Sequence, residues 1–285
     1  AEQHGRLFFE ACDLREYVRY QARHKYVNSF DLVIHLAAVV GGRMKIEGDP
    51  IAVATDLAID ADLFQWLVRD PPKKVIYFSS SAVYPIEMQQ QDSHCTLSEG
   101  MVKFGGTRLG MPDQTYGWSK LTGELLARHA VETYGLDVVI YRPFSGYGAD
   151  QSLDYPFPSI IKRVVEKQDP ITIWGSGDQV RDFIYIEDVV DIVMATYDKL
   201  KPGEALNLGC GQGISFKQLV RAACVLLDHE AEIVCDTSKP EGVFYRVADA
   251  HKMLQYKRPT IDIGEGIQRV AAYIRKQLDT AVQSV

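Results

Sequence analysis

The chain has 285 residues, of which 46% are hydrophobic and 24% are charged, and its formal net charge is −7. A chain of this length can bury a substantial core, in one large domain or in two lobes. The acidic balance argues against nucleic acid as a main partner, and no apolar stretch approaches the roughly 18 residues that would span a bilayer. Five scattered cysteines without a C-x-x-C pair favour a reducing cytoplasm over a disulfide scaffold or a zinc site.

Apolar runs alternate with amphipathic stretches along the chain, which is typical of a parallel α/β sheet. The pattern predicts strands at 31–38, 74–80, 137–143, 171–174 and 205–208, and helices at 51–68, 117–134, 158–167, 186–200, 215–227 and 264–277. We expect a Rossmann-like doubly wound sheet in a cofactor lobe over residues 1–143 and a smaller α/β substrate lobe over 144–285. The strand at 205–208 is a candidate to return to the first lobe.

The most informative pattern is a strand that ends in serine, followed downstream by Tyr116 and Lys120 at the start of a helix. These two residues are four positions apart, so they share one face of that helix. A neighbouring ammonium favours phenolate, and we expect Lys120 to lower the pKa of Tyr116 from its ordinary value of about 10. Ser80 ends the strand at 74–80, at the edge where open α/β sheets bind ligands. Hydroxyl, phenol and ammonium together predict redox chemistry on a sugar hydroxyl.

A Rossmann lobe normally begins with a strand, a glycine-rich turn and a helix that hold the pyrophosphate of a dinucleotide. That unit is missing from the sequence, and the glycine cluster at 209–213 comes too late and follows no long parallel strand. Either the sequence lacks the first unit of its natural protein, or the protein holds pyrophosphate in another way. We expect the first, because the sequence opens in the middle of the alternating pattern.

On these residues the chain resembles the extended short-chain dehydrogenases/reductases that act on nucleotide sugars, over essentially its whole length. The resemblance implies that Ser80, Tyr116 and Lys120 are catalytic. It also implies contacts with the cofactor, shared between Tyr116, Lys120 and residues that follow the strands of the first lobe: Asp13, Leu14 (after a strand at 6–10), Leu36, Ala37, Ala38, Ser79, Pro143 and Phe144.

The same resemblance implies contacts with the substrate from Gly42, Ser81, Ser145, Arg181 and Arg246. An arginine suits this role because its planar fork matches phosphate oxygens. The implied cofactor is NAD, with NADP as the alternative. The implied partner is a nucleotide-diphosphate sugar, bound by a cytoplasmic homodimer that pairs through the helices at 51–68 and 117–134.

Within this family, the segments 37–42 and 236–242 resemble GDP-fucose synthases and GDP-mannose epimerases most closely. The chain departs from the 3,5-epimerases at Ala82, where they carry a cysteine, and dehydratases and decarboxylases carry a glutamate there. Dehydratases also have an aspartate in the place of Ser81. Because a methyl and a hydroxymethyl group cannot act as general acid or base, the resemblance implies chemistry at one carbinol only. A 4-epimerase, an NADPH-dependent 4-keto-sugar reductase and a non-catalytic nucleotide-sugar-binding homologue are all open.

One further departure concerns Asp56, near the place where the family has an asparagine beside the cofactor. Its carboxylate either puts a like charge near the pyrophosphate or faces solvent in the first turn of a helix, where an acid is favourable.

Overall fold

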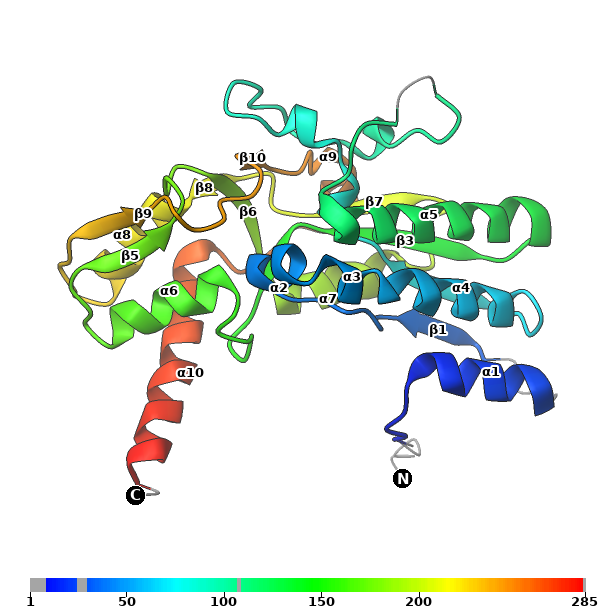
Figure 1. The fold of residues 1–285 in the computed structure, drawn as a ribbon, viewed down its shortest axis with the longest axis horizontal. Coiled ribbons are helices and arrows are strands. Elements are labelled where there is room, and N and C mark those ends of the chain that lie inside the picture. Colours follow the sequence, from blue (N-terminus) through cyan, green and yellow to red (C-terminus); the bar gives the residue numbers. More distant parts are fainter. Residues whose placement is uncertain (1–8, 25–29, 107–108, 284–285) are drawn as a thin grey trace.

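The computed structural model describes residues 9–24, 30–106 and 109–283, which form two lobes that lie side by side (Figure 1). The first lobe is built on a four-stranded parallel sheet in the order β1-β2-β3-β7. Its strands are β1 (Leu32–His35), β2 (Lys74–Phe78), β3 (Val138–Pro143) and β7 (Ala205–Leu208). The parallel α/β sheet predicted from the alternation of apolar runs is confirmed.

Helices cover both faces of this sheet. One face packs on α1 (Leu14–His24), α4 (Thr55–Leu67) and α5 (Gln114–Tyr134), and the other on α7 (Ile186–Thr196) and α9 (His251–Leu254). The helix predicted at 51–68 is divided into α3 (Pro50–Val53) and α4. The division lies at Ala54, and α3 itself begins at Asp49, whose side chain caps it by accepting from the backbone N–H of Ala52 at 3.1 Å.

The second lobe has shorter strands. A parallel path β10-β6-β4, with β8 antiparallel to β6, lies beside the two-stranded pair β5-β9. These elements are β4 (Ser145–Tyr147), β5 (Ile171–Trp174), β6 (Val180–Tyr185), β8 (Gly213–Ser215), β9 (Ile233–Asp236), β10 (Tyr245–Arg246), α6 (Pro156–Val165), α8 (Phe216–Leu226) and α10 (Ile263–Gln283). The three helices α6, α8 and α10 share one hydrophobic core with β5 and β6. Strands β4, β8 and β10 span three residues or fewer and are too short to show a period in the sequence, and β6 and β9 were also not predicted.

The chain crosses between the lobes more than once. It enters the second lobe after β3, yet β7 returns and pairs with β3 in parallel, with Ile140 opposite Ala205. The boundary expected at residue 143 stays a prediction. Residues 6–8 of the strand expected at 6–10 lie outside the described residues, and Phe9 and Glu10 are in no strand. Within the described ranges, none of the helices combines the length and the apolar character needed to cross a membrane.

Candidate active site

Ser80 and Tyr116 come together because the turn that directly follows β2 packs against the start of α5, although η2 (Ile86–Met88) and η3 (Glu99–Met101) lie between them in the chain. The turn is a 3-10 helix, η1 (Ser81–Val83), and Ser80 caps it by accepting from the N–H of Ala82 at 3.1 Å. At Gly117, an added Cβ would lie 2.4 Å from the carbonyl oxygen of Ala82. The glycine beside the tyrosine therefore allows α5 to begin directly against the turn that carries the serine.

The pKa of Tyr116 differs from the expectation based on sequence. Burial raises the pKa of this phenol above its ordinary value, and a hydrogen bond with Ser80 acts in the opposite direction without overcoming it. Lys120 Nζ lies 5.9 Å from the ring centroid of Tyr116 and donates to the carbonyl oxygen of Phe78 at 3.1 Å. The predicted lowering of the tyrosine pKa by Lys120 is therefore corrected, because the ammonium is directed at a backbone carbonyl.

Two buried carboxylates lie near Lys120. Burial lowers the pKa of this lysine, and the charges of Asp60 and Asp56 oppose the change. Asp60 is fully engaged, since it accepts from Tyr77 Oη at 2.6 Å and lies 2.8 Å from Nε2 of His35. Asp56 is only 1% exposed, so the interpretation that it faces solvent is wrong. Its Oδ1 accepts from the N–H of Val39, whereas its Oδ2 is buried with no hydrogen-bond partner among the described residues.

These groups fit one end of a nicotinamide dinucleotide. The orphaned Oδ2 of Asp56 is a buried acceptor, and Lys120 Nζ has donor capacity beyond its bond to Phe78. Ribose hydroxyls, which both donate and accept, would complement this pair. The glycine cluster at 209–213 follows β7 of the first sheet, but it leads into β8 and not into a helix, and the N–H groups of Cys210 and Gly211 already donate to Asp182. The described residues therefore account for the nicotinamide end and not for the pyrophosphate.

Ser79 belongs to a buried polar network, and its contact with the cofactor stays a prediction. Its Oγ donates to Oε1 of Glu124 at 2.5 Å, and the same carboxylate accepts from Arg142 at 2.8 and 2.6 Å. Arg142 in turn donates to Tyr84 Oη at 3.1 Å. All four side chains are buried, so the serine turn rests on a satisfied polar network behind the site.

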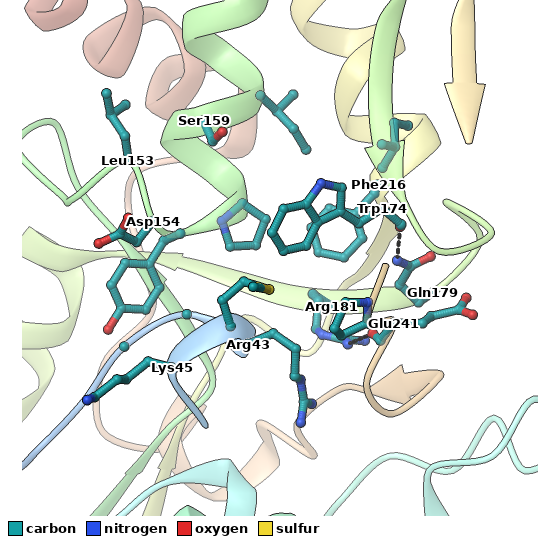
Figure 2. Close-up of a pocket in the computed structure, with 18 of the residues that line it drawn as sticks. Arg43, Lys45, Leu153, Asp154, Ser159, Trp174, Gln179, Arg181, Phe216 and Glu241 are labelled. Atoms are coloured by element: carbon teal, nitrogen blue, oxygen red, sulfur yellow. Dashed lines mark hydrogen bonds between the residues drawn. The ribbon is translucent and has the colours of Figure 1, made fainter. Parts of the chain in front are cut away.

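A cavity of about 840 Å³ lies beside the turn, with walls from both lobes (Figure 2). The first lobe contributes α2 (Arg43–Gly48) and the glycines before it, and the second contributes α6, β5 and β6. Trp174 and Phe216 form aromatic surface on one side, and the Arg181 guanidinium lies against the Phe216 ring at 5.8 Å. Aromatic walls beside a cation fit a nucleoside attached to phosphate.

A smaller cavity of about 290 Å³ shares Arg43, Arg181 and Arg246 with the first and is lined by the predicted catalytic residues Ser80 and Tyr116. The two cavities together form a path from the aromatic walls to the Tyr116 phenol. Such a path suits a ligand with a nucleotide at one end and a reacting sugar at the other.

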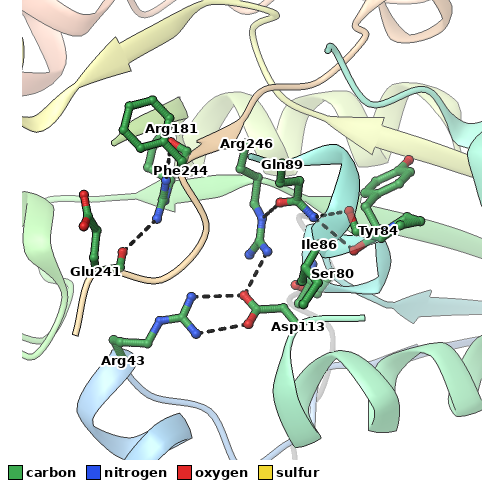
Figure 3. Close-up of polar contacts among 12 residues, drawn as sticks. Arg43, Ser80, Tyr84, Ile86, Gln89, Asp113, Arg181, Glu241, Phe244 and Arg246 are labelled. Carbon is green, nitrogen blue, oxygen red and sulfur yellow. Dashed lines mark hydrogen bonds and ion pairs between the residues drawn. The ribbon is translucent and has the colours of Figure 1, made fainter. Parts of the chain in front are cut away.

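Three arginines surround the junction of the cavities (Figure 3). Arg43 binds the Asp113 carboxylate through two hydrogen bonds of 3.1 and 3.0 Å, and Arg246 binds the same carboxylate at 2.8 Å. Arg181 donates to backbone carbonyls, at 2.8 Å for that of Val180. Burial, together with the charges of Arg246 and Arg43, lowers the pKa of Arg181 to about 9. A bound anion would relieve this crowding of positive charge.

Arg43 and Asp113 were missed by the sequence prediction. The usable signals were weak: Arg43 follows Gly41 and Gly42, and Asp113 lies three residues before Tyr116. Two segments that resemble GDP-fucose synthases are far apart in the sequence, yet they lie side by side in the structure. An added Cβ at Gly242 would lie 2.3 Å from the Arg43 guanidinium, so the segments 37–42 and 236–242 meet at this arginine.

The structure places the predicted residues in two groups. The substrate set lines one or both cavities: Gly42, Ser81, Ser145, Arg181 and Arg246. Of the cofactor set, Tyr116 and Phe144 line the smaller cavity, and the others are absent from both linings: Asp13, Leu14, Leu36, Ala37, Ala38, Ser79, Lys120 and Pro143. Asp13 lies near the surface at the start of α1, where it pairs with Arg15. This pairing lowers the pKa of Asp13 to about 2. The roles of both groups stay predictions.

Comparison with known proteins identifies the family. Residues 1–209 match the model of the NAD dependent epimerase/dehydratase family. The chain belongs to this family. A relative from Thermodesulfobacterium geofontis, a UDP-glucuronate 4-epimerase, is 29% identical over 257 residues, which cover 88% of this chain and 74% of the relative. A GDP-L-fucose synthase from Sinorhizobium fredii is 26% identical over 247 residues, which cover 83% of this chain and 76% of the relative.

Solved structures in the family have the same fold. The UDP-glucuronic acid 4-epimerase of Bacillus cereus, in complex with UDP-glucuronic acid and NAD, superimposes with a TM-score of 0.76 and 28% identity. The match covers 93% of this chain and 79% of that one. The predicted Rossmann-like fold and the resemblance to nucleotide-sugar epimerases and dehydratases are therefore confirmed.

Proposed function

We propose that this member of the epimerase/dehydratase family is an NAD-dependent nucleotide-sugar epimerase that inverts C4 through a transient 4-keto sugar. The observation that carries the proposal is the composition of the smaller cavity. Ser80 and Tyr116 supply a hydroxyl and a phenol to it, whereas Ser81 and Ala82 supply no acid or base for a second ring carbon. The carboxylate in the lining, that of Asp113, is bound by Arg43 and Arg246 and is not available as a base.

The chain's own residues have distinct roles in this reaction. Tyr116 acts as phenolate, a form that the positive charge of a bound nicotinamide would favour against the effect of burial, and it takes the proton of the sugar 4-hydroxyl and returns it. Ser80 donates a hydrogen bond to the oxygen as it becomes a carbonyl. Lys120 binds the ribose next to the nicotinamide, with Asp56 as a further acceptor. Bound NAD would supply the acceptor, and then the donor, of the hydride that C4 loses and regains.

Arg181 anchors the nucleotide while the keto sugar turns about its diphosphate linkage. Its guanidinium has no carboxylate bonded to it among the described residues, so its charge is available to phosphate oxygens. The aromatic walls of the larger cavity hold the base at a fixed distance from Tyr116. These features support the proposal because inversion requires a fixed nucleotide and a mobile sugar.

A second candidate is an NADPH-dependent reductase of a nucleotide 4-keto sugar. The observation in its favour is the meeting of segments 37–42 and 236–242 at Arg43, since both segments resemble GDP-fucose synthases. The two reactions use the same serine, tyrosine and lysine, and they differ in the handling of the cofactor. An epimerase keeps its NAD through the cycle, and a reductase exchanges NADPH.

The test is to denature the purified natural protein, measure the released nicotinamide nucleotide by mass, and then follow sugar stereochemistry by NMR. We expect NAD in equimolar amount and a mixture of C4 epimers formed without added cofactor. An enzyme that is purified empty and consumes NADPH with a 4-keto sugar would instead be the reductase. A protein that binds neither cofactor would contradict both.

A further inference from the structure

We infer that Asp113 restricts the substrate to nucleotide sugars without a carboxylate on the ring, and so distinguishes this chain from the uronate-using relatives that it resembles. The inference deepens the proposed function and rests on it. Its basis is the distribution of charge around the smaller cavity.

Asp113 is a fixed carboxylate in the sugar-binding region. It precedes the first residue of α5, its backbone N–H donates to the carbonyl oxygen of Ala82 at 2.9 Å, and its side chain lines the same cavity as Tyr116. The residue is 7% exposed. Because backbone and side chain are both held, the carboxylate cannot swing out of the cavity when a sugar enters.

The charge of Asp113 is permanent at physiological pH. Burial raises its pKa, but the charges and hydrogen bonds of Arg246 and Arg43 outweigh burial and lower the pKa to about 2. A carboxylate that receives three charged hydrogen bonds has no tendency to take up a proton near neutral pH.

Two of the three arginines that line the smaller cavity are already bound by side chains of the protein. Arg43 is bound by Asp113 on one side and by Glu47 at 3.3 Å on its Nε, and Arg246 is shared between Asp113 and Oε1 of Gln89. Arg181 is the remaining arginine of the lining, and it lies beside the aromatic walls where a diphosphate would bind. A second anion, such as a sugar carboxylate, would thus meet no uncommitted arginine among the described residues of this lining.

A uronate and a neutral hexose differ at one carbon, which carries a carboxylate in the first and a hydroxymethyl group in the second. Tyr116 and Asp113 both line this cavity of about 290 Å³. When a sugar presents its 4-hydroxyl to Tyr116, we therefore place its neighbouring substituents beside Asp113. Two carboxylates at that distance repel each other in a desolvated setting. A hydroxyl is favoured there, because Asp113 Oδ1 accepts one hydrogen bond from Arg43 and has room for another.

The test compares binding of matched sugars by calorimetry: UDP-glucose with UDP-glucuronate, and GDP-mannose with GDP-mannuronate. For the base that the protein prefers, we expect the wild type to bind the neutral sugar about 100-fold more tightly. Asp113→Asn should narrow this ratio by about tenfold or more, because the amide keeps the shape and removes the charge. Asp198→Asn is the matched control, since Asp198 is exposed and lines neither cavity; it should leave the ratio unchanged.

Equal or tighter binding of the uronate by the wild type would overturn the inference, and so would an unchanged ratio in Asp113→Asn. Asp113→Ser provides a second variant if the asparagine variant does not fold, and the wild-type ratio decides the matter independently of both. If the wild type binds the neutral sugar more tightly than the uronate but turns over neither, the inference is supported and the proposed epimerase activity is not. If none of the four nucleotide sugars binds, both the inference and the proposed function are rejected.

Discussion

The Glu124 carboxylate on α5 binds the Arg142 guanidinium on β3 through two hydrogen bonds of 2.8 and 2.6 Å, and both side chains are almost completely buried. The pair connects the helix that carries Tyr116 and Lys120 to the sheet beneath it. Because Glu124 also accepts from Ser79, one buried ion pair supports both halves of the candidate active site.

Loss of one member of this pair should therefore destabilise the fold. Glu124→Gln leaves the buried Arg142 charge without its counter-ion, and we expect the free energy of unfolding to fall by about 3 kcal/mol. The measurement is urea denaturation followed by circular dichroism. Glu132→Gln on the same helix removes an exposed partner of Arg128 and should change stability by less than about 0.5 kcal/mol. Equal effects of the two variants would refute the structural role of the buried pair.

Replacement of the catalytic phenol should separate chemistry from binding. Tyr116→Phe removes the group that exchanges a proton with the sugar, and we expect turnover to fall by about 10³-fold or more while nucleoside diphosphate binding stays nearly unchanged. Activity is followed by NMR of the C4 proton, and binding by calorimetry. Tyr134→Phe, at the exposed end of α5, is the matched control and should retain full activity. Turnover in Tyr116→Phe at the wild-type rate would eliminate Tyr116 as the acid-base group.

Arg181 should control affinity for the diphosphate. Arg181→Gln removes a charged donor from the junction of the cavities, and we expect the dissociation constant of the preferred nucleoside diphosphate to increase by about tenfold or more. Arg221→Gln, an exposed arginine on α8, serves as the control. An affinity independent of Arg181 would place the phosphates elsewhere.

Asp56 should make stability depend on pH. Burial raises the pKa of Asp56, against the hydrogen bond from Val39 and the charge of Lys120. A carboxyl with a higher pKa in the folded than in the unfolded state stabilises the fold at low pH, and this stabilisation is lost as pH rises through the folded pKa. Above pH 3.8 the wild type should thus lose stability relative to Asp56→Asn.

The check is a series of urea denaturations from pH 4 to pH 8 for the wild type, Asp56→Asn and the exposed-site control Asp198→Asn. The control should follow the wild-type profile. If the wild type instead gained stability over Asp56→Asn with rising pH, Asp56 would be a stabilised anion and its assignment as an orphaned acceptor would fail.

Much of the first lobe could be predicted from sequence because its signals are local. A buried parallel strand is a continuous apolar run, and β2, β3 and β7 were found from such runs within three residues of their ends. The spacing of Tyr116 and Lys120 on one helical face is likewise a local property. The short strands of the second lobe, such as β4 and β8, were missed because three residues carry no period.

The sequence by itself determined the fold class and the serine, tyrosine and lysine set, since each depends on residues that are neighbours along one strand or one turn of helix. Only the tertiary structure decided where the charges pair. Arg43, Asp113 and Arg246 are separated by 70 and 133 residues along the chain, yet one carboxylate binds both arginines. The burial of Asp56 and the raised pKa of Tyr116 also depend on the tertiary structure. Desolvation and charge pairing depend on distance in space, and the packing of the two lobes sets that distance.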